Sequence, residues 1–161
     1  MEQRKHTSMP MMGAILLFPS KDKTIDFGYG VKYKAYSGVH KGVDFFVPVG
    51  TPVYAAVGGT VVHAGNHLDG GWKHRGWGLA YGTQIVIDNA DFKDGTPGLW
   101  AGYAHLSKVN VKVGQKVKKG QLIGYSGKTG RVKGAHLHFE IQRTRYWSST
   151  GHVNPRKWLL A

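Results

Sequence analysis

Short apolar runs separated by turn residues dominate the chain from residue 15 onward. The runs are rich in Val, Ile and aromatic residues, and no stretch sustains the 3.6-residue repeat of an amphipathic helix. We therefore predict β-strands at 15–18, 43–49, 52–56, 60–63, 84–88, 102–105, 121–125 and 136–142. The one expected helix is a short C-terminal turn near 155–160, with Asn154 as its cap and Pro155 in its first turn. The pattern predicts an all-β fold with long loops.

A weak internal repeat narrows the expected architecture. The unit 49–53 followed by 58–61 is similar to the unit 113–117 followed by 120–122. Each consists of a Val-Gly turn, a second Val and a strand that starts at Gly. Two hairpin-like units of this kind predict a two-sheet antiparallel β sandwich or hybrid barrel. The 24 glycines, about twice the usual share, fit a fold with many turns.

Domain organisation follows from the distribution of these runs. We expect residues 1–14 to form a flexible N-terminal lead-in and residues 15–161 to form one folded domain. Two long segments, 64–82 and 89–100, interrupt the strands, and loops of this length are usually functional or mobile. Trp72 and Trp77 in the first segment either contact a ligand at the surface or cover the edge of the core.

Charge and cysteine content restrict the chemistry. The chain has 22 Lys and Arg against 9 Asp and Glu, a net charge of +13, which attracts polyanions such as nucleic acid or the anionic polymers of a Gram-positive wall. It has no Cys, so thiol catalysis, disulfides and cysteine zinc sites are excluded. No run approaches the ~20 apolar residues of a membrane helix. No signal peptide is visible either, because Pro10 interrupts the N-terminal apolar stretch and no small-residue cleavage site follows.

Histidines carry the candidate chemistry. His136 and His138 belong to a predicted strand, where residues i and i+2 share a face, so both imidazoles point the same way. His40 and Asp44 would be about 13 Å apart in a straight strand, and Gly42 permits a bend that brings them together.

A catalytic zinc site is the simplest use of these residues. Such a site usually has three protein ligands and leaves the fourth position for water. His40, Asp44 and one of His136 and His138 would complete that shell. The other histidine of that pair and His105, at the end of the strand 102–105, would remain nearby as a base or oxyanion donor. A lone His105 is more often structural, so the hypothesis depends on all these residues occurring together. The remaining histidines fit no pattern and are expected on the surface or in loops: His63, His67, His74 and His152.

The motifs together resemble the lysostaphin-type, or LytM-like, peptidoglycan metallopeptidases. The resemblance covers about 15–157 and includes HKGVDF at 40–45, PVGTPVYA at 48–55, GYAHLS at 102–107, VGQKVKKGQLIG at 113–124 and HLHFE at 136–140. It implies that His40, Asp44 and His138 bind a Zn²⁺ ion and that His105 and His136 are the catalytic pair. It also implies a two-sheet fold with a groove over the metal, acting on peptide stems or cross-bridges of peptidoglycan.

Departures from the family pattern concern specificity. The segment 131–135 reads RVKGA where relatives often have STGP, and the Trp-rich insertion at 64–82 is unusual. Relatives also place a Tyr near the oxyanion, for which Tyr33, Tyr36 and Tyr103 are candidates here.

The function expected from this resemblance is a zinc-dependent endopeptidase that works as a monomer on the cell wall. A stand-alone catalytic domain without a signal resembles phage endolysins, which a separate protein releases, so phage origin is a hypothesis. The alternative function is a catalytically silent wall-binding or regulatory module. A lipoyl-type carrier is disfavoured because the turn at Gly58-Gly59 has no Lys, and a nucleic-acid binder because no recognition motif is present.

Overall fold

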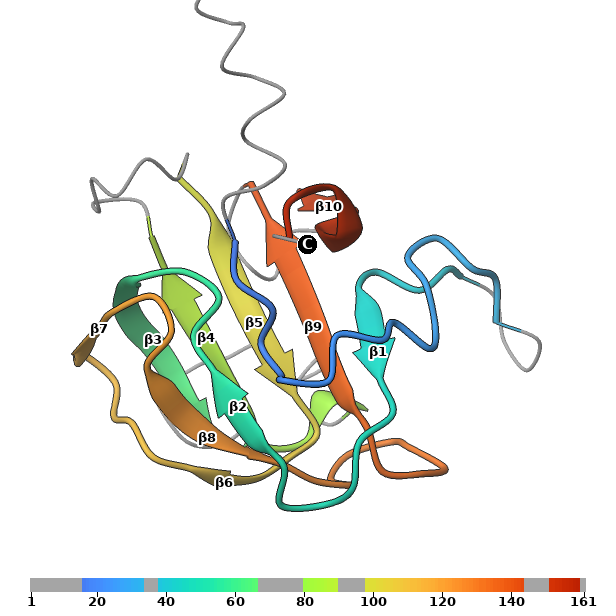
Figure 1. Cartoon of the computed structure of the whole chain (residues 1–161), viewed down its shortest axis with the longest axis horizontal. Coiled ribbons are helices and arrows are strands. Elements are labelled where there is room, and N and C mark those ends of the chain that lie inside the picture. The colour runs from blue at the N-terminus through green and yellow to red at the C-terminus, as the bar shows by residue number, and fades with distance from the viewer. Residues whose placement is uncertain (1–15, 34–37, 67–79, 90–97, 144–150, 160–161) are drawn as a thin grey trace, which may run out of the picture.

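The strands of the described ranges form two antiparallel sheets. The structure is a computed structural model that describes residues 16–33, 38–66, 80–89, 98–143 and 151–159. The larger sheet has the order β1-β9-β5-β4-β3-β7, with β10 also paired to β9, and the smaller sheet has the order β2-β8-β6 (Figure 1). The strands are β1 (Val43–Phe45), β2 (Pro52–Tyr54), β3 (Gly59–Gly65), β4 (Gln84–Asp88), β5 (Trp100–Ala104), β6 (Leu106–Val109), β7 (Lys116–Val117), β8 (Leu122–Ser126), β9 (Leu137–Gln142) and β10 (His152–Val153).

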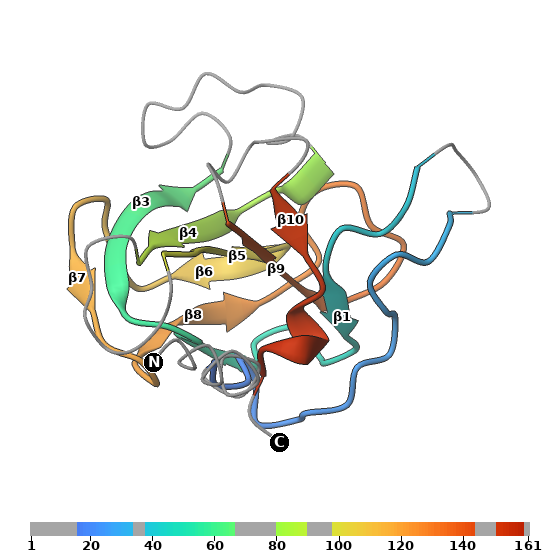
Figure 2. The same ribbon diagram turned by 90° about the horizontal axis from the view of Figure 1, so that it is seen from above.

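The hydrophobic core lies between the two sheets. In Figures 1 and 2 the strands β2, β8 and β6 lie across one face of the larger sheet. Every second side chain of the central strand β9 enters this core, namely Leu137, Phe139 and Ile141, all of which are fully buried. The intervening residues of β9 therefore lie on the opposite face of the larger sheet, and they are polar: His138, Glu140 and Gln142.

Most predicted strands are confirmed, some with shorter bounds. The range 84–88 coincides with β4, and the range 136–142 differs from β9 by one residue. The expected strand at 15–18 is wrong, since Leu16 makes only an isolated bridge to Leu159. Three short strands, β6, β7 and β10, were not predicted. They are two to four residues long and mostly exposed or half-buried, so they carry too little alternation to be recognised.

The internal repeat corresponds to paired structural units. Gly50 and Gly114 both have a φ of 92°, a left-handed conformation that favours glycine, so the two Val-Gly turns share one geometry. Strand β2 then pairs with β8, and β3 pairs with β7, so that each unit pairs with the other. In the part of the chain that the structure describes, the two sheets stay separate and form no closed barrel, which excludes the hybrid-barrel form of the prediction.

The C-terminal turn has the predicted cap. A 3₁₀ helix at Pro155–Lys157 follows Asn154, whose side chain accepts a hydrogen bond from the Arg156 backbone N–H at 3.0 Å. Among the described residues, no helix is long and apolar enough to cross a membrane. The expected lead-in at 1–14, Trp72 and Trp77 lie outside the described residues.

Candidate metal centre

Two neighbouring strands bring the three predicted metal ligands together. Asp44 on β1 lies directly opposite His138 on β9 in the antiparallel register, so their side chains share the face away from the core. His40 precedes β1, and the chain bends at Gly42. A Cβ atom at Gly42 would lie 2.3 Å from the Phe139 carbonyl oxygen and 2.9 Å from the His138 ring, so only glycine lets the bend approach β9 this closely.

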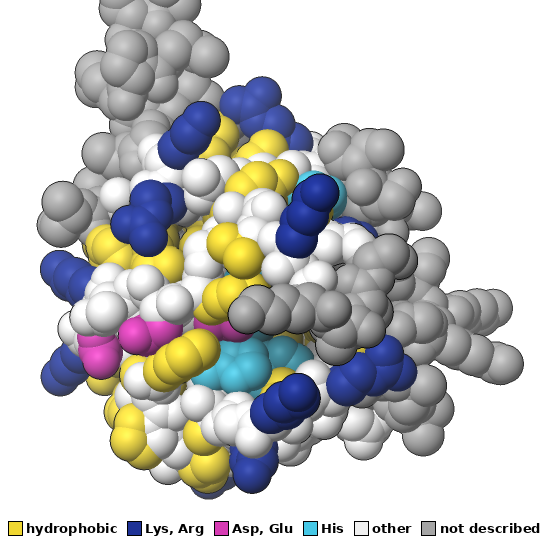
Figure 3. Space-filling view, turned by 90° about the vertical axis from the view of Figure 1, so that its right-hand side faces the viewer, with side chains coloured by type: hydrophobic (Ala, Val, Ile, Leu, Met, Phe, Trp, Pro, Cys, Tyr) yellow, Lys and Arg dark blue, Asp and Glu magenta, His cyan; other side chains and the backbone are white. Residues whose placement is uncertain are grey.

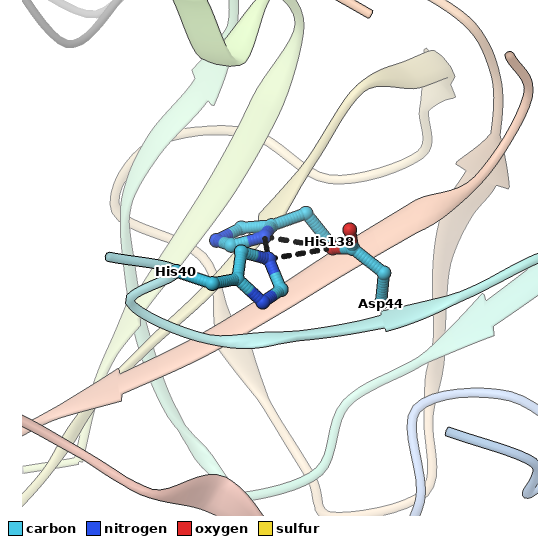
Figure 4. A group of neighbouring side chains, drawn as sticks. All are labelled: His40, Asp44 and His138. Carbon is cyan, nitrogen blue, oxygen red and sulfur yellow. Dashed lines mark hydrogen bonds and ion pairs between the residues drawn. The ribbon is translucent and has the colours of Figure 1, made fainter. Parts of the chain in front are cut away.

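The three ligand atoms form a compact triangle, shown in Figure 4. His40 Nε2 is 3.1 Å from Asp44 Oδ1 and 3.1 Å from His138 Nδ1, and His138 Nδ1 is 2.9 Å from Asp44 Oδ1. Ligand bonds of about 2.0–2.1 Å at tetrahedral angles separate neighbouring ligand atoms by about 3.3 Å. The triangle therefore has almost the size that a zinc ion requires.

The second nitrogen of each ligand ring has a partner of its own. His40 Nδ1 lies 2.8 Å from the Gly28 carbonyl oxygen, and His138 Nε2 lies 3.0 Å from Glu140 Oε2. Both partners only accept hydrogen bonds, so in a neutral ring the proton sits on the nitrogen that faces them. His40 Nε2, His138 Nδ1 and Asp44 Oδ1 then present three lone pairs to one point, which is the arrangement that a cation stabilises.

Burial and hydrogen bonding set the charges in this group. Burial opposes the ionised form of Asp44, but hydrogen bonds from His138 and His40 outweigh that penalty and hold its pKa well below the ordinary value. Burial also opposes a charge on His138, yet hydrogen bonds to Asp44 and Glu140 raise its pKa to about 10. A proton on His138 Nδ1 and a metal ion in the triangle are thus alternative partners for Asp44, while His138 Nε2 faces Glu140 in either case.

His105 adopts a backbone conformation that its neighbours impose. With a φ of 61° it is the only non-glycine residue with positive φ among the described ranges, at the point where the chain passes from β5 in one sheet to β6 in the other. Its N–H donates to the Tyr81 carbonyl oxygen at 2.9 Å, and its Nδ1 lies 2.8 Å from the Thr129 carbonyl oxygen. Strain of this kind is common at functional sites.

His136 completes the group at the start of β9. Its ring centroid is 4.7 Å from that of His105, and its Nε2 lies 3.6 Å from Asp44 Oδ2. Its Nδ1 faces the Gly134 carbonyl oxygen at 3.0 Å. Because a backbone carbonyl accepts from Nδ1 in both rings, Nε2 is the atom of each neutral ring that can take up a proton, and in His136 this atom also lies beside Asp44. Figure 3 shows histidine side chains exposed together on this face of the molecule, with Lys and Arg side chains nearby.

The burial of His105 predicts a pH dependence of stability. Burial, followed by repulsion from His138 and His136, lowers its pKa from 6.5 to about 3. The unfolded chain therefore binds more protons than the folded chain between these values, and stability falls as the pH drops below about 6.5, by up to about 1.4 kcal/mol per pH unit. His138 has the opposite effect at higher pH: the folded chain keeps its proton up to about pH 10 while the unfolded chain loses it near pH 6.5, so the stabilisation from His138 decreases between these values.

Denaturant unfolding of the chelator-treated protein at pH 4 to 6, below the range in which His138 contributes, measures this effect. We expect the free energy of unfolding of His105→Asn to depend less on pH than that of the wild type, since asparagine tolerates the left-handed conformation and does not titrate. Equal slopes for the variant and the wild type would show that His105 is protonated as easily in the folded chain as in the unfolded one.

Sequence reasoning missed two residues and misplaced others. Glu140 and Tyr81 contact the site: Glu140 hydrogen-bonds His138, and the Tyr81 ring lies 5.2 Å from the His138 ring. Glu140 was visible in the alternation of β9, whereas nothing in the sequence marked Tyr81. Of the candidate tyrosines, Tyr33 lies beside His40 with ring centroids 6.0 Å apart. Tyr103 is fully buried in the core, where it accepts a hydrogen bond from the Ala56 N–H, so its candidacy is wrong.

Of the other histidines, the two that lie in the described ranges do not join the site. His63 was expected at the surface, but it is buried on β3 with Nε2 at 3.0 Å from the Gly65 carbonyl oxygen. His152 on β10 is half-buried and hydrogen-bonds Tyr29. Tyr36, His67 and His74 lie outside the described residues.

Comparison with known proteins gives consistent matches to peptidases. The model of "Peptidase family M23" matches residues 38–155. Lysostaphin of Staphylococcus simulans is 43% identical over 125 residues, which cover 77% of this chain and 22% of that protein. The structure of its catalytic domain aligns with a TM-score of 0.65 at 38% identity, covering 82% of this chain and 88% of that domain.

A curated sequence and a solved structure from Vibrio cholerae match as well. The peptidoglycan DD-endopeptidase ShyA is 43% identical over 102 residues, covering 63% of this chain and 20% of that protein. A zinc-containing peptidase aligns with a TM-score of 0.68 at 29% identity, covering 89% of this chain and 39% of that structure. The matched region thus spans about a fifth of the length of lysostaphin and of ShyA.

Proposed function

This chain belongs to peptidase family M23, and on that premise we propose that it is a zinc-dependent endopeptidase that hydrolyses peptide stems or cross-bridges of bacterial peptidoglycan. The observation that carries the proposal is the triangle of His40 Nε2, Asp44 Oδ1 and His138 Nδ1. The relative ShyA is named a peptidoglycan DD-endopeptidase, and a zinc-containing peptidase shares the fold. The proposed site is complete within one chain, which supports action as a monomer.

The proposed chemistry divides the five site residues into two roles. A zinc ion held by His40, Asp44 and His138 would polarise the scissile carbonyl and lower the pKa of bound water to about 7. His105 and His136 have ring centroids 4.7 Å apart, and a backbone carbonyl oxygen faces Nδ1 of each ring, so Nε2 is the atom that can exchange a proton. One of them would accept the proton of the attacking water, and the other would donate a hydrogen bond to the developing oxyanion.

Charge supports a second element of the proposal, attraction to anionic wall polymers. The net charge is +13, and two of the acidic residues, Asp44 and Glu140, are buried in the site. Lys128, Arg131 and Lys133 are exposed on the segment that leaves β8 and returns to His136. A basic surface beside the site would concentrate the enzyme on a polyanionic wall at low salt.

The decisive experiment measures new amino groups released from purified peptidoglycans. The substrates would have either glycyl cross-bridges or direct D-alanyl links to a diamino acid, each prepared with and without its anionic polymers. We expect cleavage of one cross-link type, with a steeper loss of activity in salt where the polymers are present. Mass spectrometry of the fragments identifies the bond.

The same experiment tests the alternative of a silent wall-binding module. A protein that carries one zinc per chain, binds every wall and releases no amino groups would replace the peptidase proposal with that alternative. The pair of His105 and His136, each held through Nδ1 by a backbone carbonyl oxygen, favours the enzyme, because a binding module has no need of it. The proposed place of action is the cell wall. A coding sequence embedded among phage structural genes would support the endolysin hypothesis, and one without them would contradict it.

A further inference from the structure

A second carboxylate lies directly behind the metal ligand His138. Glu140 follows it on the same face of β9 and has no exposed surface. Its Oε2 lies 3.0 Å from His138 Nε2 and accepts a hydrogen bond from the Tyr81 hydroxyl at 2.5 Å, while its Oε1 accepts from Gln142 Nε2 at 3.0 Å. Both carboxylate oxygens are therefore held in place by donors from two different elements.

This carboxylate decides which nitrogen of His138 is free to bind a metal. A neutral imidazole has one N–H and one lone pair, and an ionised carboxylate can only accept. With Glu140 at Nε2, the proton lies on that nitrogen and the lone pair lies on Nδ1, the atom that faces Asp44 and His40. The same contact places negative charge behind the ring and increases its basicity as a ligand.

The surroundings of Glu140 leave space for this arrangement and fix it. Gly102 lies opposite Glu140 on β5, so no side chain from that position competes for the volume above the carboxylate. Tyr81, in the helical turn at 80–81, fills part of it and packs against Val86. A charge that is fully removed from water is tolerated only where it is paired and hydrogen-bonded, and in this group the paired residue is His138.

Tyr81 also connects this ligand to the catalytic pair. Its carbonyl oxygen accepts the backbone N–H of His105, the residue with positive φ, while its hydroxyl donates to Glu140. One residue therefore restrains both the strained turn at His105 and the carboxylate behind His138.

We propose that Glu140, oriented by Tyr81 and Gln142, is a positioning residue that fixes His138 as an Nδ1 ligand and sets the affinity of the site for zinc. The inference rests on the proposed function, because it requires His138 to bind the metal. Glu140 touches neither substrate nor the reacting atoms, so its effect is exerted through His138.

The test measures zinc affinity of the full chain by competition with a chromophoric chelator. Glu140→Gln keeps the size of the side chain and an acceptor oxygen but removes the charge, and we expect zinc binding to weaken by about 10–100-fold. Tyr81→Phe removes one hydrogen bond to Glu140 and should weaken zinc binding by a smaller factor. Tyr125→Phe on β8, in the other sheet, makes the same chemical change away from the site and should leave the affinity unchanged.

A nuclear magnetic resonance measurement separates positioning from a general loss of structure. In ¹⁵N-labelled, zinc-loaded wild type, we expect His138 to show a protonated Nε2 and a metal-bound Nδ1, a pattern that a merely structural role for Glu140 would not require. Glu140→Gln should retain this pattern with weaker zinc binding, since the amide oxygen still accepts from Nε2.

Three results would be informative in different ways. If the wild type binds zinc and the zinc affinities of Glu140→Gln and Tyr81→Phe both lie within twofold of the wild-type value, the positioning role is overturned. The proposed function is then left intact. A His138 ring bound through Nε2 would overturn the inference as well. Wild type that binds no zinc would overturn the proposed function, and this inference with it.

Discussion

Replacing His138 with alanine is expected to remove zinc binding and peptidoglycan cleavage together. The substitution deletes one of three ligand atoms that lie within 3.1 Å of one another, and it leaves Asp44 and Glu140 without their shared partner. Changes around a ligand already weaken metal binding about 10–100-fold, so loss of the ligand itself should exceed about 100-fold. Activity should fall by at least about 1,000-fold, since a metal contributes several kcal/mol to the transition state and 1.36 kcal/mol is a factor of ten.

Zinc content after dialysis and amino-group release from peptidoglycan measure the two effects of His138→Ala. His152→Ala is the matched control, because His152 is a histidine on β10, the strand beside β9, and lies outside the ligand triangle. If His138→Ala fails to fold, Asp44→Asn tests the same triangle with almost no change of volume. A variant that keeps stoichiometric zinc at wild-type affinity would remove His138 from the ligand set.

Replacing His105 is expected to separate metal binding from catalysis. His105 donates no atom to the triangle, and its Nδ1 is engaged by the Thr129 carbonyl oxygen. We therefore expect zinc content to remain at the wild-type level while activity falls by about 10²–10⁴-fold, the usual contribution of a general acid or base. The loss should appear in kcat more than in KM, because the interaction forms in the transition state.

The backbone at His105 determines how this experiment is designed. Alanine at a φ of 61° adds strain, whereas asparagine adopts left-handed conformations more readily, so His105→Asn separates the loss of the imidazole from distortion of the turn. We expect His105→Ala and His105→Asn to show the same loss of activity and His105→Asn to be the more stable of the two. Activity within tenfold of wild type in His105→Asn would assign the general base and the oxyanion donor to other groups.

The strand that carries the site was predictable because its signal is local. Alternation along 136–142 places His136 and His138 on one face and Leu137 and Phe139 on the other, and the structure confirms this arrangement for β9. Spacing alone could not bring His40 and Asp44 together, since four residues of straight strand span about 13 Å. The observed bend depends on contact between Gly42 and β9, almost a hundred residues later in the chain.

Several features of the site depend on residues that are distant in sequence. Which nitrogen of each ring faces the metal is decided by Gly28 for His40 and by Glu140 for His138. Tyr81 reaches Glu140 because the turn at 80–81 packs over the polar face of the larger sheet, and no local pattern encodes that contact. His63 was misplaced for a similar reason, since its burial depends on what covers β3.

The sequence by itself determined the all-β fold class, most of the strands and the set of candidate histidines, because side-chain alternation and turn residues act over a few positions. Resemblance to a known family then selected His138 over His136 as the expected third ligand. Only the tertiary structure decided which strands form each of the two sheets, the size of the ligand triangle, the strained turn at His105 and the carboxylate behind His138. Each of these depends on long-range packing, which fixes distances that local periodicity leaves open.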